Sequence, residues 1–160
     1  MKGEENSREY QKKIASFLER KFGKILKEKF REEDLIRVER GLKLGGGFYS
    51  PRMDVAVGPF SFARGNRNEE YNQLLDIHEI REFLSRVVKR GKTLTKDFIK
   101  SVKDSENKNP RCFICIEVEN KSTRKHFMGS AFNSSIMGKV GIVISYDKGK
   151  MEKVFSYLKE

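Results

Sequence analysis

Apolar residues recur at helical spacing through the first part of the chain, with Lys, Arg and Glu between them. A period of 3.6 residues places such positions on one face of a helix. The pattern predicts one amphipathic helix over residues 6–30. Its apolar face consists of Tyr10, Ile14, Phe17, Leu18, Phe22, Ile25 and Leu26.

Two stretches with strand character follow this helix. Residues 35–44 carry apolar side chains at even positions, which predicts a half-buried strand. Residues 53–58 predict a second strand, entered through the segment 50–52 (SPR). Between them, the three glycines at 45–47 favour a hairpin turn with positive φ over a phosphate-binding loop.

A helical insert is expected over about residues 60–110. An apolar stripe predicts a helix over 69–89, and a short helix over 95–102 precedes a polar linker at 104–110. The apolar stripe includes His78, which we therefore interpret as a packing residue rather than a catalyst.

The last third of the chain alternates strand and helix. Strands are expected over 111–119 and 140–145, with a helix over 123–137 between them and a closing helix over 151–158. A strand-helix-strand unit of this kind is a parallel crossover. The fold class is therefore α/β: residues 1–160 form a single domain with a mixed central sheet flanked by helices.

Charge narrows the class of partner. The 160 residues include 34 Lys and Arg against 23 Asp and Glu, a formal net charge of +11. Such an excess of positive charge attracts polyanions, and nucleic acid is the partner class that it favours most. No apolar stretch approaches the ~18 residues of a membrane-spanning helix, and residues 1–6 contain no apolar signal segment, so we expect an intracellular, cytoplasmic protein without a membrane partner.

Several catalytic patterns are excluded. Residues 90–93 (RGKT) end like a phosphate-binding loop, but Arg86 stands where that loop needs glycine. No serine lies in a nucleophile elbow. For His126, beside Arg124 and Lys125, a solvated helix face is favoured over a phosphate contact.

Cys112 and Cys115 have the spacing of a metal or redox pair, yet they lie inside an apolar strand. Residues three apart in a strand point to opposite faces, and no further cysteine completes a zinc site. We expect both to be reduced, buried and unligated.

The informative segment is 116–121 (IEVENK), where an apolar strand ends in charged residues. The period of two places Glu117, Glu119 and Lys121 on one face. Asp54 is likewise isolated in an apolar strand. If the two strands are adjacent, Asp54 and Glu119 converge, and a divalent cation would offset the cost of burying them.

This arrangement resembles the PD-(D/E)XK nuclease superfamily, whose restriction-endonuclease-like core has the order α-β-β-β-α-β. The segment 50–54 (SPRMD) is similar to the Pro-Asp element, although two residues separate Pro51 from Asp54. The Glu-x-Lys pattern occurs three times in the chain, but only at 119–121 does it close an apolar strand.

The resemblance implies roles for particular residues. Asp54 and Glu119 would hold Mg²⁺, with Mn²⁺ as a substitute, together with the backbone carbonyl of Asn120. Lys121 would orient the attacking water. Glu9 is the candidate for the additional first-helix glutamate, ahead of Glu5 and Glu19.

Further residues would support the site or bind substrate. By the same resemblance, Asn133 would support the carboxylates from the helix after the motif. We expect Arg124, Lys125, Lys12 and Lys13 to contact the DNA backbone. The expected function is a metal-dependent endonuclease acting on DNA, and a homodimer would allow so small a domain to cut two strands.

Two alternatives remain open. The same fold could be a catalytically inactive nucleic-acid-binding module, or a structural or partner-binding domain whose charge serves solubility. Metal-dependent cleavage would distinguish the nuclease from both alternatives. Salt-sensitive binding of polyanions would distinguish the nucleic-acid-binding module from the structural or partner-binding domain.

Overall fold

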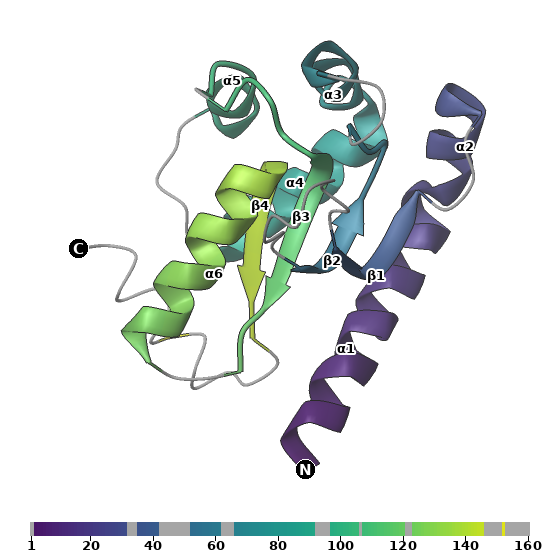
Figure 1. The fold of residues 1–160 in the computed structure, drawn as a ribbon. Coiled ribbons are helices and arrows are strands. Elements are labelled where there is room, and N and C mark those ends of the chain that lie inside the picture. Colours follow the sequence, from purple (N-terminus) through teal and green to yellow (C-terminus); the bar gives the residue numbers. More distant parts are fainter. Residues whose placement is uncertain are drawn as a thin grey trace, which may run out of the picture.

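A four-stranded mixed sheet forms the centre of the fold, with the spatial order β1-β2-β3-β4 (Figure 1). β1 pairs with β2 and β2 with β3 in antiparallel fashion, whereas β3 and β4 are parallel. The α/β class and the parallel crossover are therefore confirmed. The strands are β1 (Ile36–Gly41), β2 (Arg52–Val57), β3 (Cys112–Val118) and β4 (Gly138–Ile144).

The computed structural model describes residues 2–31, 35–41, 52–61, 66–91, 97–105, 107–120, 123–145 and 152. The expected turn at 45–47 and the closing helix at 151–158 lie outside these ranges, apart from residue 152. None of the helices within them has the length and apolar character to cross a membrane.

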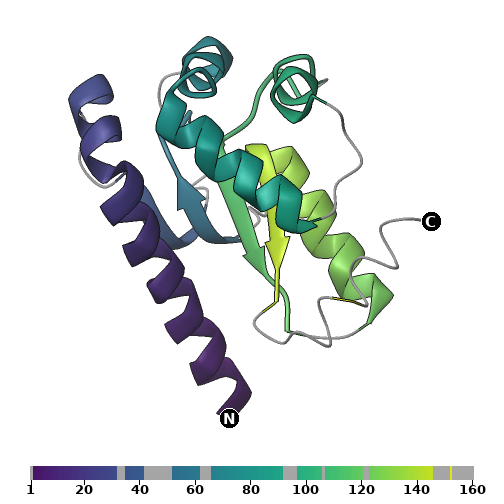
Figure 2. The same cartoon turned by 180° about the vertical axis from the view of Figure 1, so that it is seen from behind.

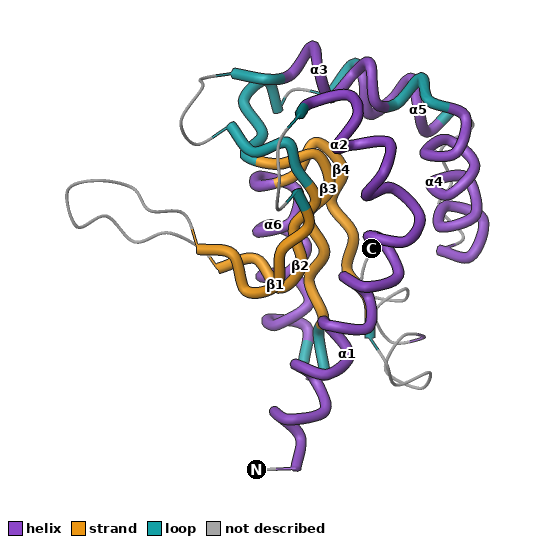
Figure 3. Tube along the Cα trace, turned by 90° about the vertical axis from the view of Figure 1, so that its right-hand side faces the viewer, coloured by secondary structure: helices purple, strands orange, loops and turns teal. Residues whose placement is uncertain are grey.

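Helices cover both faces of the sheet. α6 (Arg124–Met137) links β3 to β4 and lies on one face (Figure 1). α1 (Lys2–Leu18) and α4 (His78–Gly91) lie on the opposite face, as the view from behind shows (Figure 2). Seen from the side, the strands form a layer between these two sets of helices (Figure 3).

The predicted first helix is present but not uniform. α1 is followed by a π-helical turn, η1 (Glu19–Gly23), and then by α2 (Lys24–Phe30). A π turn inserts an extra residue and rotates the following face of the helix. Leu18, Phe22 and Leu26 are nevertheless all buried, so this turn lies within the core-facing part of the segment.

The described part of the insert contains three helices, and the single helix expected over 69–89 is divided. α3 (Asn68–Leu74) and α4 are separated by a turn in which the Ile77 N–H donates to the Leu74 carbonyl. Asp76 in this turn accepts a 2.6 Å hydrogen bond from Lys103 at the end of α5 (Phe98–Lys103). The break thus allows the insert to fold back on itself.

The insert also fills the core on the α1 face of the sheet. Tyr71 stacks on Phe113 with ring centroids 6.2 Å apart, and its hydroxyl donates to the Pro59 carbonyl. Burial of such large side chains is a main source of folding stability. Other buried members of this core are Leu18, Phe22, Leu26, Leu35, Val55, Val57, Leu74, Leu75, Ile80, Leu84, Val102, Ile114, Ile116 and Val140.

A smaller cluster lies on the α6 face. It consists of Met53, Ala56, Cys112, Cys115 and Met137. α6 approaches β4 closely there: a Cβ added to Gly141 would lie 2.9 Å from the backbone carbon of Ser134. This packing holds α6 in place over the ends of β2 and β3, where the candidate residues lie.

Candidate functional site

Asp54 lies where the pairing between β2 and β3 ends. The last paired residues on this side are Val55 and Ile116. Just beyond them, the Val118 N–H donates to Asp54 Oδ2 over 2.8 Å, so a side chain occupies the place of a backbone partner. The condition for Asp54 and Glu119 to approach one another, that β2 and the strand preceding Glu119 are adjacent, is met.

Glu117 lies beside Asp54 and faces α6. Glu117 is only 8% exposed, and Asn133 Nδ2 of α6 donates a hydrogen bond to Glu117 Oε1 over 2.5 Å. The Cys115 thiol donates a weaker contact to the same oxygen at 3.9 Å. Asn133, expected to support the site, therefore contacts Glu117 rather than a residue of the predicted metal pair.

The carboxyl group of Glu117 is buried and has two other acids near it. Burial, followed by the charges of Asp54 and Glu119, raises its pKa to about 8, against the partial opposition of the Asn133 and Cys115 hydrogen bonds. Because both neighbouring carboxyl groups act on Glu117, three acids share one region of the α6 face. Such a concentration of carboxylates in a buried setting favours a proton or a cation.

Glu119 follows β3 directly and is held at two points. Its N–H donates to the Ile144 carbonyl over 2.8 Å, which prolongs the pairing with β4. Its Oε2 accepts a 3.1 Å hydrogen bond from the Ser130 hydroxyl of α6. The half-buried Asn120 comes next, at the point where the chain leaves the sheet.

Glu117 and Ser130 are not among the residues that the sequence predicts for the site. A signal for Glu117 was present, because it shares the face of Glu119 by the period of two. Ser130 and Asn133 are three apart on a helix, which places them on the same side and allows each to reach one acid. That α6 turns this side toward β3 depends on its packing, which no local pattern gives.

The remaining predicted residues lie at several places. Lys121 is outside the described residues. Glu9 is exposed on α1, a helix that lies on the opposite face of the sheet from α6 (Figure 3). Arg124 and Lys125 are exposed in the first turn of α6, whereas Lys12 and Lys13 are exposed on α1.

The donor set suits a hard divalent cation. Carboxylate and carbonyl oxygens are the ligands that Mg²⁺ prefers. Within the described ranges, no group of three or more His, Cys, Asp or Glu residues lies close enough together to hold a metal ion. A site made by Asp54, Glu119 and the Asn120 carbonyl needs only two such side chains and stays a prediction.

The expected positions of the two cysteines and of His78 are wrong in part. Cys112 and Cys115 are buried and free, as expected, but they do not lie on opposite faces. Both belong to the cluster under α6, and a hydrogen bond with Cys112, followed by burial, raises the pKa of the Cys115 thiol. His78 does not pack in the core: it is exposed where α4 begins, because the helix break at 75–77 removes it from the apolar stripe.

Three comparisons, with protein-family models, with curated proteins and with solved structures, find no match to this chain.

Proposed function

We propose that this chain is a metal-dependent nuclease that hydrolyses phosphodiester bonds in DNA, on a core of the restriction-endonuclease-like type. The observation that carries the proposal is the position of Asp54, which accepts a hydrogen bond from the Val118 N–H next to Glu119. The buried Glu117 lies beside them and is held by Asn133. Carboxyl groups held together in this way bind a divalent cation favourably. The order of elements, with three insert helices between β2 and β3, agrees with that core.

Each residue would contribute a distinct part. Asp54 and Glu119, with the Asn120 carbonyl, would hold Mg²⁺ or Mn²⁺. The bound ion would supply Lewis acidity at the scissile phosphate and lower the pKa of a water molecule. Asn133 and Ser130 fix the orientation of Glu117 and Glu119, and this preorganisation limits the cost of rearrangement on binding.

Lys121 would supply the positive charge. It follows Glu119 by two residues in the sequence, the spacing of the Glu-x-Lys pattern. An ammonium group there would orient the attacking water and stabilise the negative charge that develops on the phosphate. Loss of one such electrostatic contact commonly lowers a rate by ~10²–10³.

The exposed cations in the first turn of α6 would bind the phosphate backbone of the substrate. Arg124 and Lys125 begin the same helix whose later turns contact Glu117 and Glu119. A phosphate backbone attracted to this turn would therefore run close to the acids. This contact supports DNA as substrate but carries no sequence preference, because phosphate contacts read no bases.

Cleavage of duplex, branched and single-stranded DNA with and without Mg²⁺ or Mn²⁺ tests the proposal. The wild type should cleave at least one substrate only with metal. Asp54→Asn, Glu119→Gln and Lys121→Ala should lose cleavage, and Lys121→Ala should keep metal binding. Glu69→Gln, which changes an exposed carboxylate of α3, is the matched control and should cleave as the wild type does.

The second candidate function is a catalytically inactive nucleic-acid-binding module. The net charge of +11 favours DNA binding with or without cleavage. If no substrate is cut under any metal condition while DNA binding persists, this function replaces the nuclease. Equal cleavage by the wild type and all three variants would instead place the catalytic centre elsewhere.

A further inference from the structure

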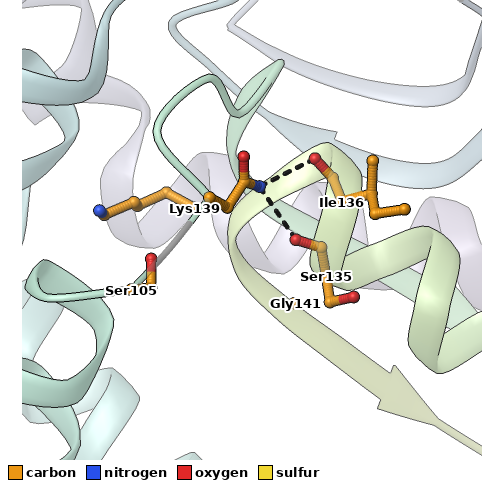
Figure 4. A pocket seen from close by; sticks show the side chains of 6 residues that line it. Ser105, Ser135, Ile136, Lys139 and Gly141 are labelled. Carbon is orange, nitrogen blue, oxygen red and sulfur yellow. Dashed lines mark hydrogen bonds between the residues drawn. The ribbon is translucent and has the colours of Figure 1, made fainter.

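A second polar site lies away from the acids, between the end of α5 and the junction of α6 with β4. It is a pocket of about 500 Å³, a volume within the range of small-molecule sites. Figure 4 shows the Lys139 side chain extending from β4 toward the segment that carries Ser105. The lining residues are Ser105, Asn107, Ser135, Ile136, Lys139 and Gly141.

One wall of the pocket is fixed by Asn107. Its Nδ2 donates to the carbonyls of Ser135 at 3.0 Å and Ile136 at 2.9 Å, the hydrogen bonds drawn in Figure 4. A longer contact of 3.4 Å reaches the Gly138 carbonyl. These bonds satisfy the carbonyls at the end of α6, which otherwise lack partners. The Asn107 amide is therefore already engaged in hydrogen bonds within the protein.

Two hydrogen-bond donors of the lining are poorly satisfied. The Lys139 residue is only 5% exposed, and its Nζ donates one long hydrogen bond, 3.4 Å, to the Lys103 carbonyl. No carboxylate of the described residues forms an ion pair with it. The Ser105 hydroxyl is buried without a hydrogen-bond partner. A buried cation and an unsatisfied hydroxyl are both costly unless an acceptor reaches them.

The charges near Lys139 leave its ammonium without full compensation. Burial lowers its pKa, Lys108 lowers it further, and only Asp104 acts in the opposite direction. An anion in the pocket would reverse this balance, because it would pair with the buried charge and relieve the repulsion between the two lysines.

We propose that this pocket binds the phosphate group of a nucleotide-sized ligand, with Lys139 and Ser105 as donors to its oxygens. A phosphate offers several acceptor oxygens to the two donors, and the half-exposed Ile136 provides an apolar surface for the remainder of the ligand. The ligand is a free nucleotide or the phosphorylated end of a nucleic acid strand. The site is separate from the acids and does not depend on the proposed nuclease activity.

Calorimetric titration of the intact protein tests the proposal with defined probes. These are inorganic phosphate, adenosine monophosphate, adenosine, and one short oligonucleotide with and without a 5′-phosphate. Adenosine monophosphate should bind saturably and adenosine should not. A preference for the phosphorylated oligonucleotide identifies a strand end as ligand, and binding of the mononucleotide alone identifies a free nucleotide.

Variants connect the binding to the pocket. Lys139→Met should weaken adenosine monophosphate binding about tenfold or more, because a charged hydrogen bond is lost. Ser105→Ala should weaken it severalfold and keeps the test valid if Lys139→Met fails to fold. Lys108→Met, an exposed neighbour, should have a smaller effect. Asp54→Asn should bind the probe as the wild type does, whatever its effect on cleavage.

The proposal is overturned if the wild type binds none of the phosphate probes. It is also overturned if Lys139→Met and Ser105→Ala, both folded by thermal melting, bind them as tightly as the wild type. Lys139 would then serve only to satisfy the carbonyl at the end of α5.

Discussion

The backbone N–H of Val118 donates to the carboxylate of Asp54 over 2.8 Å, at the point where β2 and β3 cease to pair. The hydrogen bond fixes one oxygen of Asp54 against β3 and brings its charge close to Glu117. The pKa of Glu117 is raised by burial first and by this charge second. One side chain thus both satisfies the separating strands and contributes to the acidic site.

Replacement of Asp54 should separate these two effects. Asp54→Asn retains an oxygen that can accept from Val118 and removes the charge near Glu117, so the metal-free protein should be at least as stable as the wild type. Asp54→Ala leaves the Val118 N–H without that acceptor and should be less stable than Asp54→Asn by ~1–3 kcal/mol. Chemical denaturation with a chelator measures both. Equal stability of the two variants would contradict the structural role of this hydrogen bond.

Stability without metal should depend on pH through Glu117. Its pKa is about 8 in the folded protein against 4.5 for an ordinary glutamate, so the folded state binds the proton more tightly. The resulting stabilisation is fully present below about pH 4.5 and is lost as pH rises through 8. Glu117→Gln keeps an oxygen for Asn133 and cannot ionise.

Comparison of the wild type with Glu117→Gln across pH 5 to about 9 measures this dependence. The variant should lose less stability on going from acid to alkaline pH, with a difference on the order of a few kcal/mol. Parallel curves for the two proteins would show that Glu117 does not carry the predicted proton.

The contact between α6 and β4 should tolerate no added side chain. A Cβ at Gly141 would lie 2.9 to 3.0 Å from the backbone and hydroxyl of Ser134, so Gly141→Ala should destabilise the fold by ~1–3 kcal/mol. Gly129 lies on the same helix, α6, and a Cβ added there would have no neighbouring atom within 4 Å. Gly129→Ala should therefore stabilise the helix by up to ~1 kcal/mol. Denaturation curves should show opposite signs, and a neutral Gly141→Ala would argue against close packing of α6.

The two thiols should be unreactive in the native protein. Cys112 and Cys115 are buried, and the raised pKa of Cys115 keeps that thiol protonated, whereas the thiolate is the reactive form. A thiol reagent should label both only after denaturation. Ser85→Cys, an exposed position of α4, provides a thiol that should react at once. Rapid native labelling of the wild type would contradict the cluster under α6.

DNA affinity should depend more on α6 than on α1. Arg124 and Lys125 share a helix with the residues that contact the acids. Lys12 and Lys13 belong to α1, which lies on the opposite face of the sheet (Figure 2). Replacing the first pair with Gln should weaken binding and reduce the slope of log affinity against log salt by about 2. The matched double replacement at Lys12 and Lys13 should change the slope less. DNA binding by the wild type and the two double variants, measured at several salt concentrations, tests this prediction. A salt-independent affinity would exclude contacts with the DNA phosphate backbone.

The sequence by itself located the segments that form the described helices and strands, because the spacing of apolar residues follows the geometry of each element. It did not show the π turn at Glu19–Gly23 or the break between α3 and α4. It also predicted correctly that β3 and β4 are parallel, because parallel neighbours need a long crossover connection and the helix between them supplies one. Asp54 and Glu119 could be selected as candidates from the sequence, because each is a charged residue within or at the end of an otherwise apolar strand.

Only the tertiary structure decided what these residues contact. The contact of Asn133 with Glu117 and the common cluster of Cys112 and Cys115 depend on how α6 packs on the sheet, and side-chain alternation alone predicted the cysteines wrongly. The pocket at Lys139 likewise joins segments that are distant along the chain. Local patterns fix the period of an element, but the free energy of packing between elements fixes which side chains meet.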